Sequence, residues 1–110
     1  MIANWWLFRA WLLCQPSGVE VGYTWFPDGS PIARWLEYET GKEYEIWQDN
    51  YNVLGADEMD DLPLPFWVHL YHPLVDGRKD RYGSPIYREH ALRILEFVEY
   101  GMAQQMLKEK

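Results

Sequence analysis

The chain has a single cysteine and only three serines among its 110 residues. One cysteine, Cys14, excludes an intrachain disulfide, so a reducing, cytoplasmic location is expected. None of the serines lies in a nucleophile-elbow motif. Gly41-Lys42 lacks the upstream glycine of a phosphate-binding loop. The sequence therefore predicts neither a serine hydrolase nor a phosphate-loop enzyme.

A long hydrophobic run and an excess of positive charge are also missing. The apolar stretch from Trp5 to Cys14 contains Arg9 and is much shorter than the roughly 20 residues of a membrane span. It has no basic n-region and no small-residue cleavage site, so no signal peptide is predicted. The net charge of −7 argues against binding to a membrane or directly to nucleic acid, since both are anionic.

Metal and acid–base chemistry have weak candidates only. His69, His72, His90 and Cys14 are potential zinc ligands, but His69 and His72 are three apart on a predicted strand and would point to opposite faces. The Asp57–Asp61 run lacks the glycine and terminal glutamate of a calcium loop. No cleft is predicted beside the carboxylates. We therefore expect no catalytic residue, no metal site and no cofactor.

Aromatic residues are abundant, with seven Trp and eight Tyr. Each large ring can bury about 150–250 Å², so a few of them would nearly fill the core of so small a protein. The surplus is typical of protein interfaces, where Trp and Tyr act as anchors. An aromatic-rich core with half-exposed rings is the alternative.

Negative charge is concentrated in one part of the chain. Residues 37–61 hold nine acidic residues and one basic residue, a formal charge of −8, whereas the other 85 residues hold nine basic and eight acidic ones, a charge of +1. Four aromatic residues lie within this window. Such a segregated anionic surface is typical of a binding site for a cationic partner, and equally of a well-solvated loop and hairpin.

The pattern predicts one α+β domain over residues 1–110: a mostly antiparallel meander of four to five strands packed against one long C-terminal helix. Alternating or continuous apolar residues favour strands, and a helix competes with a strand over residues 3–14 and 31–38. Residues 49–65 are expected to form a loop. The expected strands span residues 3–14, 19–26, 32–38, 43–48 and 66–71.

Two predicted features position the acidic residues and the helix. A three-residue loop, Glu39-Thr40-Gly41, would join the third and fourth strands and give one apolar face and one acidic face flanked by Trp35 and Trp47. Ser84 would cap a helix that has Pro85 at its first position and ends near Leu107. Its predicted core stripe is Ala91, Ile94, Leu95, Val98 and Met102, extended by Tyr87 and Met106.

These observations favour a small, acidic, non-enzymatic protein-binding module. Its partner would be a basic protein surface of a nucleic-acid-binding protein. Small acidic inhibitors carried by phages and mobile elements, including anti-CRISPR and anti-restriction proteins, work this way as a class. The alternatives are a homodimer joining the basic helix start to the acidic hairpin, and a small metal- or carboxylate-dependent enzyme. The predicted partner-binding residues are Trp35, Glu37, Glu39, Glu43, Glu45, Trp47, Asp49, Asp57, Glu58, Asp60 and Asp61.

Overall fold

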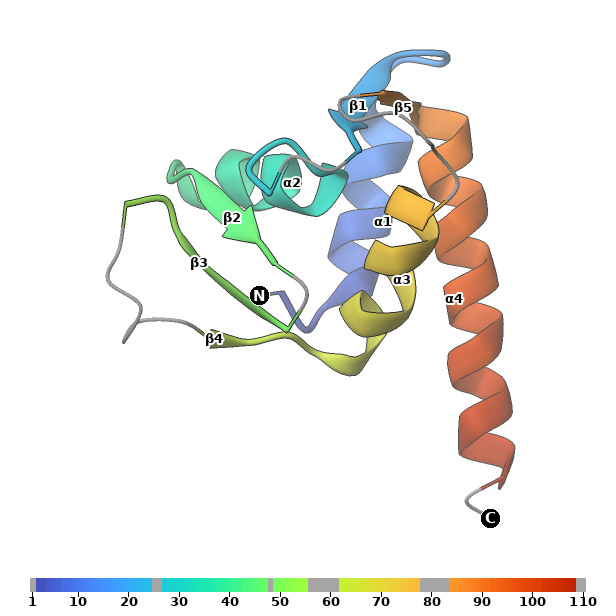
Figure 1. Ribbon diagram of the computed structural model, residues 1–110. Helices are drawn as coiled ribbons and strands as arrows, with labels where there is room; N and C mark the ends of the chain where they lie inside the picture. The colour runs from blue at the N-terminus through green and yellow to red at the C-terminus, as the bar shows by residue number, and fades with distance from the viewer. Residues whose placement is uncertain (1, 25–26, 48, 56–61, 78–83, 109–110) are drawn as a thin grey trace.

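Four helices and two small antiparallel sheets form the described part of the chain (Figure 1). The computed structural model describes residues 2–24, 27–47, 49–55, 62–77 and 84–108. The predicted α+β class and the long last helix are confirmed. In chain order the elements are α1 (Trp5–Cys14), β1 (Glu20–Tyr23), α2 (Pro31–Thr40), β2 (Tyr44–Ile46), β3 (Asn50–Val53), β4 (Leu62–Pro63), α3 (Phe66–Gly77), β5 (Pro85–Tyr87) and α4 (Arg88–Lys108).

The predicted single meander of four to five strands does not form. β1 pairs with β5, and β2, β3 and β4 make a separate three-stranded sheet in that order, both antiparallel. β1 lies within one predicted strand and β2 within another. Residues 49–65 were expected to be a loop, yet they contain β3 and β4. The two sheets lie apart, with helices between them (Figure 1).

α1 replaces the strand predicted over residues 3–14. Its sequence, WWLFRAWLLC, contains no β-branched residue, and Leu, Ala and Arg are good helix formers. Phe8 and Leu12 are four apart and fully buried, which is the spacing of neighbours on one helix face. Propensity and burial thus both favour the helix that the continuous apolar run had concealed.

α2 replaces the strand predicted over residues 32–38, and the competing helix with Pro31 at its first position is the correct one. The Ser30 hydroxyl accepts a hydrogen bond from the Ala33 N–H at 3.2 Å, which caps the start of the helix. Gly41 ends it in the left-handed conformation (φ 75°), and its N–H donates to the Glu37 carbonyl. Gly41 is therefore the end of a helix rather than part of a hairpin loop.

α3 replaces the strand predicted over residues 66–71 and continues through Pro73. Trp67, Val68, Tyr71 and Val75 are buried, and their spacing is helical rather than alternating. Proline removes one hydrogen bond from a helix interior, but the burial of this apolar face outweighs that loss.

α4 confirms the predicted core stripe and the predicted end, but not the start. Ala91, Ile94, Leu95 and Val98 are buried. Ser84 and Pro85 do not begin the helix, because Pro85 starts β5 and the Ser84 N–H and carbonyl bond to Thr24. Tyr87 and Met106 are exposed and do not extend the stripe.

The core is centred on aromatic rings contributed by three helices. Phe8 of α1 lies 5.3–5.5 Å, between ring centroids, from Trp35 of α2 and from Trp67 and Tyr71 of α3. The buried Trp67 indole donates to the Ile2 carbonyl at 2.7 Å and the Tyr71 hydroxyl donates to the Ala91 carbonyl. Burial also raises the pKa of Tyr71 far above its usual value. Large rings thus fill the core, as one of the two alternatives for the aromatic surplus predicts.

None of the described helices is both long and apolar enough to cross a bilayer.

Gly22 of β1 and Gly101 of α4 make a matched test of how tightly the chain packs around β1. A Cβ at Gly22 would lie 2.7–2.8 Å from backbone atoms of Pro31 and Gly29, whereas a Cβ at Gly101 of α4 meets nothing within 4 Å. We expect Gly22→Ala to lower the free energy of unfolding by about 1–3 kcal/mol, because backbone cannot move aside easily. Gly101→Ala should raise it by about 0.5–1 kcal/mol. Urea unfolding measures both, and equal effects would contradict the packing around Gly22.

Candidate partner-binding surface

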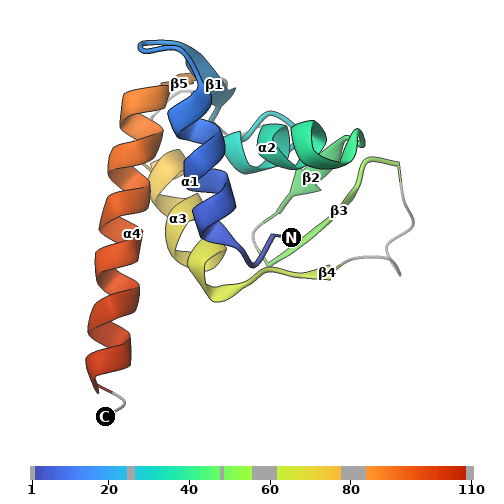
Figure 2. The same ribbon diagram turned by 180° about the vertical axis from the view of Figure 1, so that it is seen from behind.

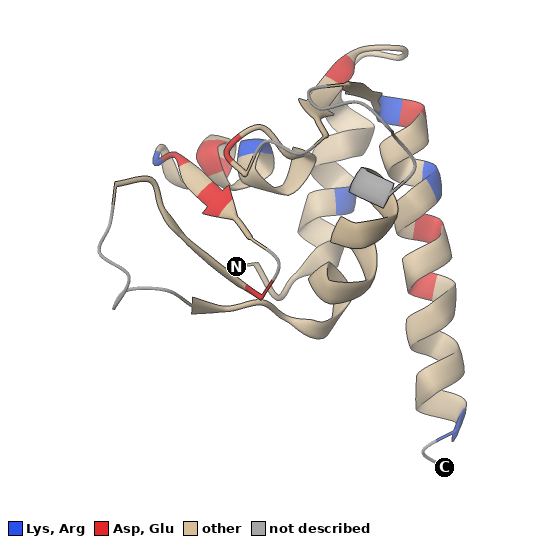
Figure 3. Ribbon diagram, viewed as in Figure 1, with Lys and Arg blue, Asp and Glu red and all other residues tan. Residues whose placement is uncertain are grey.

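Four of the predicted acidic residues gather around one end of the molecule. Glu37 and Glu39 lie on the last turn of α2, Glu43 follows the turn after this helix, and Glu45 lies on β2. α2 and β2 pack against each other, and the acidic positions cluster over them (Figure 3). Glu45 is half-buried and the other three are exposed. We call these four residues the acidic end.

The acidic end is convex rather than flat. Residues two apart in an α-helix are turned about 200° from each other, so Glu37 and Glu39 point to opposite sides of α2. The predicted flat acidic face between two indoles is therefore wrong. The carboxylates instead surround the end of the helix and continue onto β2.

Electrostatics at this end are unfavourable to the isolated protein. The C-terminus of a helix carries about half a negative charge, which cationic side chains normally offset. α2 has no basic residue in its last turn, and two carboxylates occupy that turn instead. Lys42 is the basic residue between Glu39 and Glu43. The negative end of the helix thus adds to the field of the side chains.

Apart from Lys42, the described basic residues lie away from these carboxylates. Arg34 pairs with Glu20 at 3.1 Å and lies over the Tyr23 ring. Arg88 and Arg93 belong to α4, which lies apart from α2 (Figure 3). Within the described ranges, no Lys or Arg forms an ion pair with the four carboxylates of the acidic end. Their charge is directed at solvent.

The other predicted binding residues do not all join the acidic end. Trp35 is fully buried in the core, because its helical spacing from Ile32 and Leu36 turns it inward. Trp47 is 45% exposed and follows β2. Asp49 lies beyond the other end of this strand, next to the first residue of β3. The predicted residues Asp57, Glu58, Asp60 and Asp61 lie outside the described residues.

One aromatic residue at this end was missed. Tyr38 lies between Glu37 and Glu39 on α2 and is 73% exposed. The predicted hairpin placed the Tyr38 side chain on the apolar face toward the core. In a helix, by contrast, its spacing of two residues from the buried Leu36 places it on the solvent side. Tyr44 and Tyr51 pack 6.2 Å apart on β2 and β3. Burial, and then the nearby Tyr44, raise the pKa of Tyr51.

A metal site and a pocket were sought in the described part of the chain. No group of three or more His, Cys, Asp or Glu there is placed to hold a metal ion. A pocket of about 240 Å³ between α3 and α4 is lined by Leu74, Arg93, Ile94 and Phe97. That volume is below the roughly 300–1,000 Å³ of typical small-molecule sites, and Arg93 is the titratable residue among these four.

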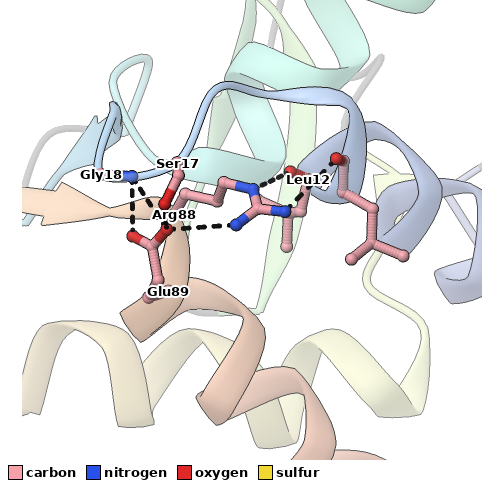
Figure 4. A network of polar contacts seen from close by, with 6 residues as sticks. Leu12, Ser17, Gly18, Arg88 and Glu89 are labelled. Atoms are coloured by element: carbon pink, nitrogen blue, oxygen red, sulfur yellow. Dashed lines mark hydrogen bonds and ion pairs between the residues drawn. The ribbon is translucent and has the colours of Figure 1, made fainter.

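The carboxyl group of Glu89, on α4, has a strongly lowered pKa (Figure 4). The pKa of Glu89 falls to about 2, first because the Gly18 N–H donates to its carboxylate at 2.8 Å, then because its own N–H, Ser17 and Arg88 also donate. Arg88 in turn donates to the carbonyls of Leu12 and Leu13 at the end of α1. Perturbed acids often mark functional sites. Here the donors to Glu89 come from the loop before β1 and from α4, so the network fastens this loop and the end of α1 to α4.

No family model, no curated protein and no solved structure matches this chain.

The two tryptophans predicted to flank the acidic residues should respond unequally to removal. Trp35→Ala should lower the free energy of unfolding by about 3–5 kcal/mol, because it leaves a cavity in the ring cluster. Trp47→Ala should lower it by clearly less, about 1–2 kcal/mol, because the half-exposed side chain gives up only part of a buried ring's contact area. Chemical denaturation of the two variants checks this, and a small effect at Trp35 would contradict its burial.

Glu89 predicts a specific pH dependence of stability. Its folded pKa of about 2 is lower than its unfolded value near 4.5, so its stabilising contribution is present above that unfolded value and is lost as the pH falls toward 2. We expect wild type to have a higher melting temperature than Glu89→Gln at pH 7, with the difference shrinking between about pH 5 and 2. Glu96→Gln, an exposed residue of the same helix, controls for loss of charge. A pH-independent difference would refute the role of the Glu89 carboxylate.

Proposed function

We propose that this protein is a small, acidic, non-enzymatic binding module of the cytoplasm that inserts its acidic end into a basic, nucleic-acid-binding cleft of another protein. In this role it would act as an inhibitor, in the manner of phage or mobile-element proteins such as anti-CRISPR and anti-restriction proteins. Trp47 and Tyr38 would supply apolar contact beside the charges.

The observation that carries the proposal is the placement of Glu37, Glu39 and Glu43 at the negative end of α2 without a compensating base in its last turn. Like charges at this position destabilise the folded chain. Such unfavourable electrostatics are expected where a cationic partner offsets the repulsion when it binds. The convex shape of the acidic end also suits a cleft better than a flat surface.

The chemistry of the partner follows from the charge. Several carboxylates spaced around a helix end resemble the successive phosphates of a nucleic acid. The negative field that they create also speeds association with a basic protein. Exposed tyrosine and tryptophan are the residue types that most often dominate binding energy. We therefore expect affinity to fall as salt rises, since screening weakens exposed charge pairs.

The alternative is a homodimer in which the basic start of α4 contacts the acidic end of a second copy. The described contacts favour it less. It uses the basic residues near the start of α4, of which Arg88 and Arg93 belong to the described part of the chain, whereas Arg78, Lys79 and Arg81 lie outside it. Arg88 already donates to two carbonyls of α1 and to Glu89. Using it in an interface would loosen the network that holds α1 to α4.

The test is capture of partners by the full-length chain from extract of its host, with double-stranded DNA as competitor. We expect the captured protein to bind DNA and to be released by it. The variant Glu37→Gln/Glu39→Gln/Glu43→Gln/Glu45→Gln should bind at least tenfold more weakly while unfolding at the same or a higher urea concentration, because crowded like charges have been removed. Wild-type affinity in this variant would refute the proposal.

A matched pair of single variants separates position from net charge. Glu37→Gln removes one charge from the acidic end, and Glu96→Gln removes one from an exposed position of α4. Affinity should fall in the first and remain near wild type in the second. Equal losses would mean that only the net charge matters and that the acidic end is not the binding site.

A further inference from the structure

α1 is apolar around almost its whole circumference, although one side of it is open to solvent. Phe8 and Leu12 face the core, and the opposite side carries five exposed residues. Surface helices normally have a polar outer face, and a helix that is apolar all round is normally buried. We call this exposed side the outer strip, which consists of Trp6, Leu7, Ala10, Leu13 and Cys14.

The outer strip is both large and uncovered. Trp6, Leu7 and Leu13 are 51%, 40% and 54% exposed. Seen from behind, α1 crosses the near side of the molecule between α4 and α2, with α3 behind it (Figure 2). The acidic end lies to one side of the strip and does not overlie it. Contiguous exposed apolar surface of this kind marks an interaction site.

The strip has little charge to offer a partner. Arg9, the charged residue of α1, lies at its edge and pairs with Glu99 of α4 at 3.3 Å. Trp5 donates to the same carboxylate and locks it in place. A partner therefore has to be apolar, and an anionic membrane is disfavoured by the net charge of −7.

The side-chain sizes along the strip suit an antiparallel pairing of the strip with a second copy of itself. Ala10 is central, Leu7 and Leu13 lie three positions away on either side, and Trp6 and Cys14 lie four away. These are the spacings of neighbours on one helix face. If two copies cross antiparallel at Ala10, Leu7 meets Leu13 of the other copy, and the bulky Trp6 meets the small Cys14. The small alanine at the crossing point lets the two helices approach closely.

We propose that the outer strip is a homodimer interface, in which two copies of the chain pack α1 against α1 antiparallel about a two-fold axis at Ala10. Such an interface is closed, because each copy uses the same surface and none is left for a third. A ten-residue helix is about 15 Å long, so the interface lies at the small end of specific interfaces, below about 1,200 Å². The dimer is therefore weak and concentration-dependent. It is independent of the acidic end and differs from the homodimer considered above.

Salt separates this dimer from every charge-driven association. Each copy carries a net charge of −7, so screening reduces the repulsion between copies and dimerisation should strengthen as salt rises. Binding of the acidic end to a basic partner should weaken over the same range. The two proposals can thus fail separately.

Sedimentation velocity of the full-length protein over a hundredfold concentration range, at low and high salt, is the first test. We expect the mean mass to rise toward that of a dimer, and to rise further at high salt. Leu13→Glu and Trp6→Glu should each raise the dissociation constant at least tenfold while remaining folded, since both side chains are exposed in the monomer. Phe97→Glu, at a 67% exposed position of α4, is the matched control and should associate like wild type. A monomer under all conditions, a dimer weakened by salt, or a Leu13→Glu variant that still dimerises would overturn the proposal.

Cysteine crosslinking tests the register. In the proposed crossing the two Cys14 residues lie about 12 Å apart along the helix axis, too far for a disulfide, whereas residue 10 of one copy faces residue 10 of the other. Under mild oxidation, Ala10→Cys/Cys14→Ser should form a disulfide-linked dimer at least ten times faster than wild type. The control Ala103→Cys/Cys14→Ser, at an exposed position of α4, should react as slowly as wild type. Equal rates in the three proteins would refute the antiparallel crossing at Ala10.

A membrane is the competing occupant, and it is tested in the same way. Wild type and Leu13→Glu are spun with neutral phosphatidylcholine vesicles. Co-sedimentation of wild type alone, together with monomeric behaviour in their absence, would assign the strip to a lipid surface and overturn the dimer. No sedimentation with vesicles, alongside the salt-strengthened dimer, would support it.

Discussion

The burial of Phe8 among Trp35, Trp67 and Tyr71 is the contact on which the rest of the structure depends. It draws α1, α2 and α3 onto one point and sets the rotation of each helix about its axis. That rotation turns Trp6 and Leu13 outward, and it directs the last turn of α2 away from the core. Both candidate binding surfaces are therefore consequences of how one aromatic ring is buried.

Arg88 and Glu89 complete this arrangement by polar means. Arg88 supplies donors to the end of α1, where carbonyls lack helical partners, and Glu89 accepts from the Gly18 backbone. The pair contacts the structure at both ends of the loop between α1 and β1. A charged cluster that resembled a functional site by its perturbed pKa is thus explained by the fold.

The sequence allowed some of these features to be predicted and concealed others. The stripe from Ala91 to Val98 was predicted correctly, because only a helix brings such residues onto one face. Gly41 was placed in a hairpin loop, whereas its left-handed conformation ends α2. The Ser30-Pro31 start signal was the local feature that distinguished the two possibilities. For α1, the apolar run had no period because both of its sides are apolar. For α3, the short apolar run favoured a strand, although Trp67 and Tyr71 have helical spacing. The acidic residues were predicted to gather and four of them do, but around a helix end, and this removed Trp35 from the candidate site.

The contact between Arg88 and the Leu12 carbonyl spans 76 positions of the chain, and this separation bears on how the protein is made. At roughly 5–20 residues per second, synthesis needs about 4–15 s to deliver Arg88 after Leu12 has appeared. During that interval α1 has neither its polar attachment to α4 nor the apolar stripe of α4 to pack on. Until Trp35, and then Trp67 and Tyr71, have followed, the core side of α1 also lacks its ring partners. The segment that gives the folded protein its apolar surface thus exposes apolar side chains on both sides early in synthesis.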